Sequence, residues 1–251
     1  MSRINHVPII LFIFCLLGLL TNECLAQDMG LTGKKWKVLA DVPTPRLGCA
    51  AAVVNNKLHV LGGVNMSPHA PGGGRAARAV NLHHVYDPAA NSWSTRAPIP
   101  DNSSWPAIAA YKGKIYLFGG DNKAIDASMT NTALVYDPAT DAWSALAPLP
   151  HPRSYSSAMT VGDHIYIFGA RTLRSDGAPD RSTFRYHPPT DTYTRMADIP
   201  EGARFMVCGC YKRHIYVVHG ETDRETYADG VLKYDVAANT WTKLNIPRLE
   251  Q

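Results

Sequence analysis

The chain has 251 residues, of which 45% are hydrophobic, so it is long enough to bury a sizeable core. Its formal net charge is +4, and its basic residues are scattered along the sequence, which argues against a nucleic-acid partner. The five cysteines form no CxxC or Cys/His array, so the sequence predicts no bound metal and no cofactor.

Residues 1–26 have the order of a secretory signal peptide. Arg3 supplies a short basic region, residues 8–20 are apolar, and Ala26 is a small residue suited to cleavage before Gln27. The apolar run is short for a membrane span. We therefore expect residues 1–26 to be removed and the protein to be exported, to the periplasm or the extracellular space, without a stable membrane span.

The first region after this leader predicts short antiparallel strands. Two apolar runs flank a polar turn at residues 55–57, and a third run ends at Tyr86. Asp87 can accept hydrogen bonds from the following turn, Pro88 fixes φ there, and Trp93 falls on a fourth, outer strand. No segment longer than a few residues has helical periodicity, so the mature chain is predicted to be all-β.

The same pattern occurs four times along the chain. Each copy has an apolar strand that ends in a small doublet, then a variable loop, a tyrosine-led turn and a closing aromatic residue. The doublets are Gly62-Gly63, Gly119-Gly120, Gly169-Ala170 and His219-Gly220, the turns begin at Tyr86, Tyr136, Tyr186 and Tyr234, and the closing residues are Trp93, Trp143, Tyr193 and Trp241. The closing residues are 50, 50 and 48 residues apart, so the sequence predicts a repeat protein.

A period near 50 residues with this glycine, tyrosine and tryptophan spacing resembles the kelch repeat, one four-stranded blade of a β-propeller of the galactose oxidase and kelch type. The resemblance extends from Trp36 to the C-terminus. It implies an all-β kelch propeller within residues 27–251, with blades at about residues 45–96, 102–146, 152–196 and 203–244. Because propellers include both enzymes and binding modules, the resemblance leaves the function open.

Segments outside the four blades indicate that the ring is incomplete. Trp36 and residues 39–43 match the outer strand that ends each later unit, but no inner strands precede them. Residues 244–248 repeat the start of a further blade. We expect part of a five- or six-bladed ring with an orphan N-terminal outer strand, either from a longer protein or from a protomer that self-associates through open sheet edges.

Candidate ligand-binding residues lie in loops that the kelch pattern places on one face. These are the loops after the doublets and the segments that lead from one blade into the next, which vary while the scaffold repeats. They are rich in arginine, which suits carboxylate, phosphate or acidic peptide, and the resemblance implies that Arg46, Arg153 and Arg204 face the central channel. Arg153 and Arg204 are expected at equivalent positions, and the alternative is that each arginine only ties blades together. The candidates are Arg46, Trp105, Arg153, Tyr155, Arg171, Arg204 and Phe205.

Three functions are compatible with this sequence. The first, which we favour, is an exported binding module for a protein or an acidic carbohydrate. The second is a sugar-acid epimerase or mutarotase, because the chain also resembles the exported kelch propellers of the N-acetylneuraminate epimerase family. That reaction needs a carboxylate beside an arginine, and the candidates are Glu201, His219 and Glu221, although the long insertion of that family is absent. The third is a copper radical oxidase of the galactose oxidase type, for which the inner-strand ends offer no histidine set.

Overall fold

The computed structural model describes residues 37–65, 78–122, 129–171, 179–202, 204–218, 220–223, 226–227 and 230–245. The chain divides into a unit at Met1–Val38 and a unit at Leu39–Gln251, and the blades belong to the second. The predicted signal peptide, Trp36, His219 and residues 246–248 lie outside the described residues.

The described elements are strands, and no helix occurs among these residues. They form four four-stranded antiparallel sheets, which we number as blades in chain order. Blade 1 contains β2 (Ala50–Val54), β3 (Lys57–Leu61), β6 (His83–Asp87) and β7 (Ser92–Thr95), and blade 2 contains β8 (Ala107–Tyr111), β9 (Lys114–Phe118), β10 (Ala133–Asp137) and β11 (Ala142–Ala145). Blade 3 contains β12 (Ser157–Val161), β13 (His164–Ala170), β14 (Asp180–His187) and β15 (Thr192–Met196), and blade 4 contains β16 (Val207–Tyr211), β17 (His214–Val218), β20 (Val231–Asp235) and β21 (Thr240–Leu244).

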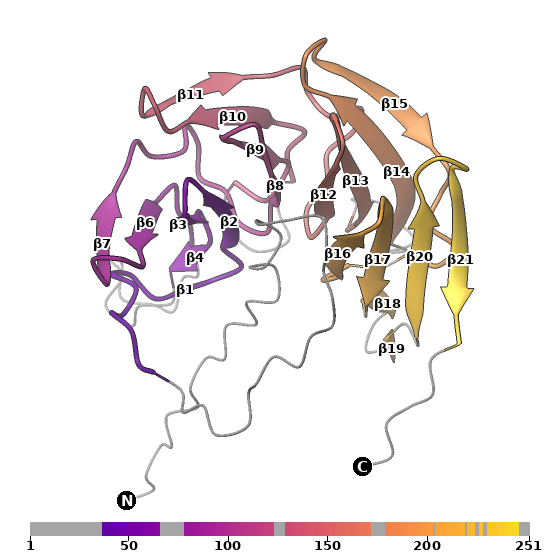
Figure 1. Ribbon diagram of the computed structural model, residues 1–251, viewed down its shortest axis with the longest axis horizontal. Coiled ribbons are helices and arrows are strands. Elements are labelled where there is room, and N and C mark those ends of the chain that lie inside the picture. Colours follow the sequence, from indigo (N-terminus) through magenta and orange to yellow (C-terminus); the bar gives the residue numbers. More distant parts are fainter. Residues whose placement is uncertain are drawn as a thin grey trace, which may run out of the picture. The chain divides into compact units, whose positions relative to one another are not determined.

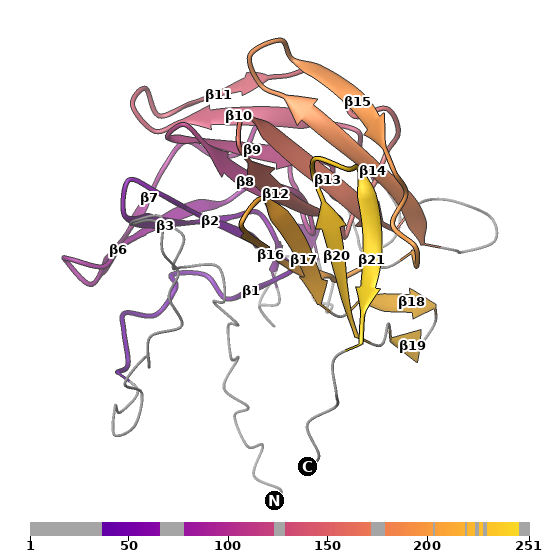
Figure 2. The same cartoon turned by 45° about the vertical axis from the view of Figure 1, so that its right-hand side comes forward.

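Short strands extend two of the blades at one end. β1 (Arg46–Leu47), β4 (Val64–Asn65) and β5 (Arg78–Ala79) form a three-stranded sheet beside blade 1. β18 (Glu221–Asp223) and β19 (Thr226–Tyr227) form a hairpin that projects beyond the end of blade 4 (Figure 2). The loops after the doublets therefore leave the blades at this end.

The blades follow one another as the sequence predicts for a propeller. Within each blade the chain runs from the innermost to the outermost strand by antiparallel pairing of neighbours. The innermost strands β2, β8, β12 and β16 contact one another in that order, and Figure 1 shows β7, β11, β15 and β21 on the outside. The all-β propeller prediction is confirmed.

Three hydrophobic clusters fill the spaces between successive blades. Alternate residues of each strand point to opposite faces, so blades 2 and 3 each contribute to the cluster before them and to the cluster after them. Leu117 of β9 packs toward blade 1, whereas its neighbour Phe118 packs toward blade 3. Blades 2 and 3 are thus buried on both faces by their neighbours, which accounts for fully buried aromatic residues on their inner strands, such as Phe118 and Phe168.

A turn residue in every blade fastens the segment that precedes that blade. The residue has a positive φ, and its side-chain oxygen accepts hydrogen bonds from the blade's own tyrosine hydroxyl and from a backbone N–H of the preceding segment. The turn residues are Asn91, Asp141, Asp191 and Asn239, and their backbone partners are Ala40, Ala97, Ala147 and Ala197. The closing aromatic residue donates to the carbonyl of the same alanine, at 2.9–3.0 Å in each blade. We call this arrangement the interblade clamp.

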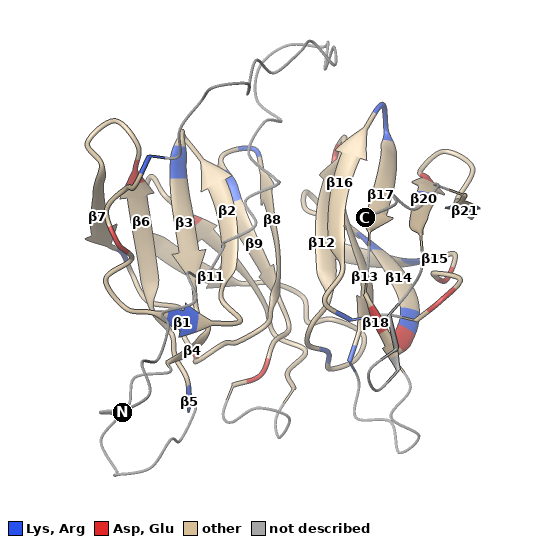
Figure 3. Cartoon of the chain, turned by 90° about the horizontal axis from the view of Figure 1, so that it is seen from below, with Lys and Arg blue, Asp and Glu red and all other residues tan. Residues whose placement is uncertain are grey.

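Charges are mixed over the described blades. Figure 3 shows basic and acidic segments interspersed along strand ends and turns. This distribution fits the small net charge of the sequence. Within the described ranges, no helix has the length and hydrophobicity needed to cross a membrane.

Candidate functional site

The segments that lead into the innermost strands share a left-handed backbone residue two positions before the strand. These lead-in residues are Gly48, Trp105, Tyr155 and Phe205, with φ between 50° and 65°. A β-carbon at Gly48 would lie 2.4 Å from an atom of the Trp105 ring, so the first position requires glycine. The other positions hold large aromatic residues in a conformation that L-residues seldom adopt, and such strain is frequent at functional sites.

The aromatic lead-in residues form a continuous row. The rings of Trp105 and Tyr155 are stacked at 4.8 Å, and the rings of Tyr155 and Phe205 meet edge to face at 4.5 Å. Backbone hydrogen bonds run in the same direction, from the Trp105 N–H to Gly48 and from the Tyr155 N–H to Trp105. Tyr155 is buried and Phe205 is 50% exposed, so the row presents its Phe205 end to solvent. The structure brings these predicted site residues together.

Polar side chains flank this row. In blades 2, 3 and 4, the residue before the aromatic lead-in residue forms a backbone bridge with the residue that follows the doublet. Isolated β-bridges join Ser104 to Asp121, Ser154 to Arg171 and Arg204 to Glu221. Arg204 thus corresponds to Ser154, and the expected equivalence of Arg153 and Arg204 is wrong by one residue. The correct counterpart of Arg153 in blade 1 is Arg46, since each lies two residues before the left-handed position.

Arg204 lies at the exposed end of the row with a carboxylate partner. Its Nε and Nη2 donate to the two carboxylate oxygens of Glu221, at 3.0 and 2.5 Å. The guanidinium carbon lies 5.7 Å from the Phe205 ring centroid. With side chains 22% and 15% exposed, the pair is partly accessible. A guanidinium has five N–H donors, and the two on Nη1 take no part in the contact with Glu221.

Asp121 is a charged residue of this region that the sequence analysis missed. It is fully buried, and neither carboxylate oxygen has a hydrogen-bond partner among the described residues. Burial raises the pKa of Asp121, and the nearby Ser154 hydroxyl and the charge of Arg171 oppose that effect only in part. Asp121 shares the position after the doublet with Val64, Arg171 and Glu221, but this position does not report its burial.

Tyr155 lies between the charges of blades 2 and 4. Burial raises the pKa of its hydroxyl to about 12, and Asp121, Arg204 and Glu221 all act electrostatically on it. The phenol therefore stays protonated at neutral pH, where it can donate a hydrogen bond. Arg171 bonds through its backbone to Ser154, and its charge reaches Asp121.

Arg153 has a different environment, inside blade 3. Its side chain is fully buried, donates to Asp180 at 2.8 Å and to Ser182, and lies 4.9 Å from the Phe184 ring centroid. Burial opposes the charge on Asp180, but hydrogen bonds from Ser182 and His151 and the charge of Arg153 outweigh it and lower the pKa to about 2. This geometry matches the alternative in which an arginine ties the structure together.

His151, Asp180 and Ser182 are in mutual contact, which raises the question of nucleophilic catalysis. In a catalytic triad the hydroxyl and the carboxylate bond to different ring nitrogens of the histidine. Here both the Ser182 hydroxyl and the Asp180 carboxylate approach Nε2 of His151, and the hydroxyl donates to the carboxylate itself. The arrangement lacks the geometry that would activate a serine.

The remaining candidates are not brought to the aromatic row. Arg46 reaches the Val60 carbonyl at 3.4 Å, and its Nε and Nη1 are buried without a hydrogen-bond partner among the described residues. Glu201 accepts from Lys243 of the outer strand β21, so the candidate acid Glu201 is not the carboxylate that pairs with Arg204. No cluster of three or more histidine, cysteine, aspartate or glutamate residues in the described part of the chain could hold a metal ion.

Comparison with known proteins identifies the family. A family model described as the KLHDC2/KLHL20/DRC7 Kelch-repeats domain matches residues 21–169 and 72–250, which together span most of the chain. The chain therefore belongs to the kelch-repeat family. Its fold is similar to that of a solved structure described as "Structure of YjhT", with a TM-score of 0.68 and 18% identity, over 80% of this chain and 72% of that one.

Curated relatives are similar over shorter stretches. The N-acetylneuraminate epimerase of Pasteurella multocida is 38% identical over 96 residues, which is 37% of this chain and 24% of the relative. Kelch-like protein 25 of Homo sapiens is 34% identical over 90 residues, which is 35% of this chain and 15% of the relative. The chain matches less than a quarter of each of these proteins, so their activities do not transfer with the fold.

Proposed function

We propose that the chain is an exported binding module that holds an anionic ligand, an acidic glycan or an acidic peptide, against the aromatic row. The observation that carries this proposal is the row of Trp105, Tyr155 and Phe205 beside the Arg204–Glu221 pair. Aromatic rings offer rigid contact area, and a guanidinium offers paired hydrogen bonds to a carboxylate.

Among the arginines considered, Arg204 fits this role better than Arg153. Arg204 is partly exposed at the solvent end of the row, whereas Arg153 is buried and paired with Asp180. A ligand carboxylate can bind at Nη1 of Arg204 while Glu221 stays in place and orients the guanidinium. Phe205, under the same guanidinium, provides the adjoining apolar surface.

The test is a binding titration of the purified chain against a panel of acidic glycans and acidic peptides, followed by calorimetry on any hit. Arg204→Gln and Phe205→Ala are each expected to weaken binding by roughly tenfold, the equivalent of 1.4 kcal/mol. The matched control is Arg195→Gln, which removes an exposed arginine from the outer strand β15. Equal affinities of Arg204→Gln and the unmodified chain for an identified ligand would overturn the proposal.

Export rests on the order of basic, apolar and small residues in the leader. Mass spectrometry of the protein recovered from the periplasm or the medium should show a chain that begins at Gln27. A recovered chain that still carries residues 1–26 would contradict export by cleavage.

A second function, epimerisation of a sugar acid, is supported by one relative and one contact. The relative is the Pasteurella multocida epimerase, and the contact is the Arg204–Glu221 pair, which places a carboxylate that can transfer a proton beside a cation that can hold an acid. NMR can follow interconversion of N-acetylneuraminate anomers with the chain present. A rate enhancement that is lost in Glu221→Gln and kept in Glu201→Gln would establish this function, and no enhancement would leave binding alone.

A further inference from the structure

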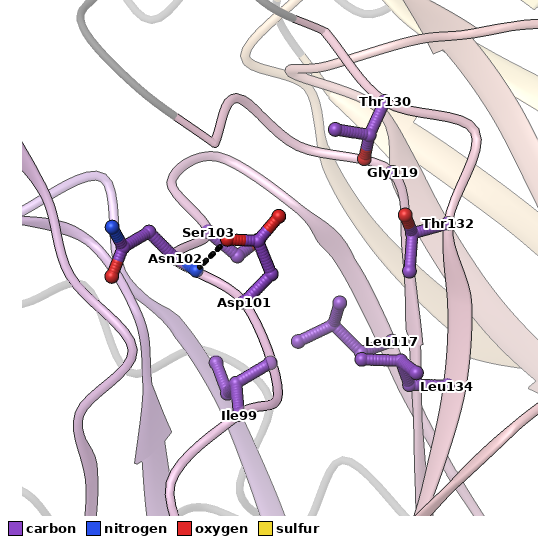
Figure 4. A pocket seen from close by; sticks show the side chains of 9 residues that line it. All are labelled: Ile99, Asp101, Asn102, Ser103, Leu117, Gly119, Thr130, Thr132 and Leu134. Atoms are coloured by element: carbon purple, nitrogen blue, oxygen red, sulfur yellow. Dashed lines mark hydrogen bonds between the residues drawn. The ribbon is translucent and has the colours of Figure 1, made fainter.

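A small pocket opens in blade 2, beside the segment that leads to Trp105. Figure 4 shows residues 99–103 on one side of it and two threonines on the other. Its cavity volume is about 10 Å³, which is room for roughly one water-sized group. Its polar lining residues are Asp101, Asn102, Ser103, Thr130 and Thr132.

The same place in blade 3 is filled by the side chain of Arg153. Ser103 and Arg153 occupy the same backbone position, because the carbonyl of each accepts from the second residue of the preceding doublet, at 2.7 and 2.9 Å. The strand registers also show that Leu134 of β10 corresponds to Phe184 of β14. Leu134 pairs with Leu117 and Phe184 pairs with Ile167, and each partner lies two residues before the doublet of its own blade. The pocket is therefore the position that holds a cation in blade 3.

The residues around the cation are replaced in blade 2 by neutral hydroxyls. Counting back from the matched pair Leu134 and Phe184, Thr132 stands in the position of Ser182, and Thr130 in the position of Asp180. The negative charge comes instead from Asp101, which stands where blade 3 has His151. Blade 2 thus keeps oxygen acceptors and one carboxylate at a site from which the arginine side chain is missing.

The oxygen atoms of this pocket have unused hydrogen-bonding capacity. The Ser103 hydroxyl is buried and has no hydrogen-bond partner among the described residues. Asp101 accepts from the Asn102 N–H at 2.8 Å and from the Asn122 amide at 3.1 Å. A carboxylate has about four acceptor positions, so these two contacts leave others available at the pocket mouth.

We propose that this pocket binds a primary ammonium group, as carried by an alkylamine or a lysine side chain. An ammonium head is about the size of a water molecule and has three donors, which suits the volume and the hydroxyl oxygens of Ser103, Thr130 and Thr132. The Asp101 carboxylate offsets the charge at the mouth. A free guanidinium is planar and larger, so it fits this volume less well. The site differs from the aromatic row in its lining residues and in the charge of its ligand.

The test is a thermal-shift and NMR titration of the full chain with n-butylammonium at constant ionic strength. Tetramethylammonium has the same charge but no donor, so it should produce no saturable response. Binding on the order of millimolar is expected for n-butylammonium, and N-acetyl-lysine amide tests whether a lysine side chain serves as well. Asp101→Asn should raise the Kd by roughly tenfold, which is 1.4 kcal/mol. Asp198→Asn, which changes an exposed aspartate after β15, is the matched control.

A tethered ammonium gives an independent test. Ser103→Lys should place its own ammonium in the pocket, melt at a higher temperature than Ser103→Met and no longer respond to n-butylammonium. No saturable response in the unmodified chain, or an equal response in Asp101→Asn, would overturn the proposal. If the Ser103 variants do not fold, Thr132→Val decides the matter, because loss of an exposed hydroxyl should weaken amine binding without affecting the fold.

Discussion

Arg153 and Arg204 show how surroundings decide the role of a residue type. Arg153 is enclosed with Asp180, Ser182 and Phe184, and burial lowers the pKa of its guanidinium to about 10. Arg204 has a carboxylate partner but keeps 22% of its side chain exposed. Arg153 therefore stabilises the fold, and Arg204 remains accessible to a ligand.

Arg153→Ala should therefore lower the free energy of unfolding by about 3–5 kcal/mol, because it leaves the Asp180 carboxylate buried without its cation. Arg204→Ala should cost less than about 1 kcal/mol, since Glu221 can then be hydrated. Urea unfolding followed by tryptophan fluorescence measures both. Similar losses in the two variants would show that Arg204 is structural as well.

A buried histidine pair in blade 1 is a second feature at the residue scale. Nδ1 of His83 lies 3.2 Å from the Ala97 carbonyl, which can only accept, so this nitrogen carries the proton. Nε2 of His83 then accepts from Nδ1 of His59, at 2.9 Å. Burial lowers the pKa of both histidines to about 4, and the charge of Arg96 adds to the effect. The Asp141 carboxylate acts on His83 in the opposite direction.

This pair predicts acid sensitivity below neutral pH. With folded pKa values near 4 and an unfolded value of 6.5, the unfolded chain binds more protons between these limits, so stability is complete above pH 6.5 and falls toward pH 4. The loss at pH 5 is about 2 kcal/mol per histidine. Urea unfolding at pH 7.5 and pH 5 measures it. His59→Tyr with His83→Ala, the residues found in blade 2, should reduce the pH dependence, and an unchanged dependence would contradict this account.

Sequence reasoning identified the residues of the aromatic row but not the environments of the arginines. Trp105, Tyr155 and Phe205 are 50 residues apart, so the repeat alone predicts that they meet. The burial of Arg153 depends on Asp180, which lies 27 residues away beyond a variable loop. Asp121 was missed because its significance depends on burial, which no local pattern reports.

At the scale of the elements, the interblade clamp connects the outer turn of each blade to the segment that precedes that blade. Asp141 accepts from the Tyr136 hydroxyl at 2.6 Å and from the Ala97 N–H at 3.0 Å, and it does so with φ of 52°. Asparagine serves the same purpose at the turns of blades 1 and 4. The repeat pattern predicts the tyrosine and the closing aromatic residue of this clamp but not the turn residue five positions after the tyrosine.

Asp141→Ala should destabilise the protein by roughly 2 kcal/mol, because it removes the acceptor of two partly buried hydrogen bonds. Asp141→Asn is the matched control and should cost less than about 0.5 kcal/mol, since its carbonyl oxygen accepts the same bonds. Thermal unfolding of the two variants compares them. If both lose equal stability, the carboxylate charge matters rather than the acceptor.

At the scale of the whole molecule, the face of β16 that points away from blade 3 is more exposed than the corresponding face of β8 in blade 2. Ala107, Ala109 and Tyr111 of β8 are buried against blade 3. The corresponding Val207 and Tyr211 of β16 are 52% and 43% exposed. Exposed apolar residues of this size at a sheet face favour association.

The isolated chain is therefore expected to self-associate at micromolar concentration, as measured by size-exclusion chromatography with light scattering. Val207→Asp with Tyr211→Lys should shift it toward the monomer by charging this face. Ser92→Asp with Thr95→Lys introduces the same two charges at exposed residues of the outer strand β7 and serves as a control for charge alone. A monomeric unmodified chain would contradict the expectation.

The direction of the interblade clamp bears on how the chain acquires its structure during synthesis. Each turn residue accepts a hydrogen bond from a segment that was synthesised earlier. When a new blade leaves the ribosome, the alanine N–H that its turn residue binds has therefore already been made. Folding can then advance from the N-terminal blade without waiting for later sequence, as in other repeat proteins. A nascent chain arrested after blade 2 should already protect Ala97 from hydrogen exchange, while Ala147 waits for Asp191.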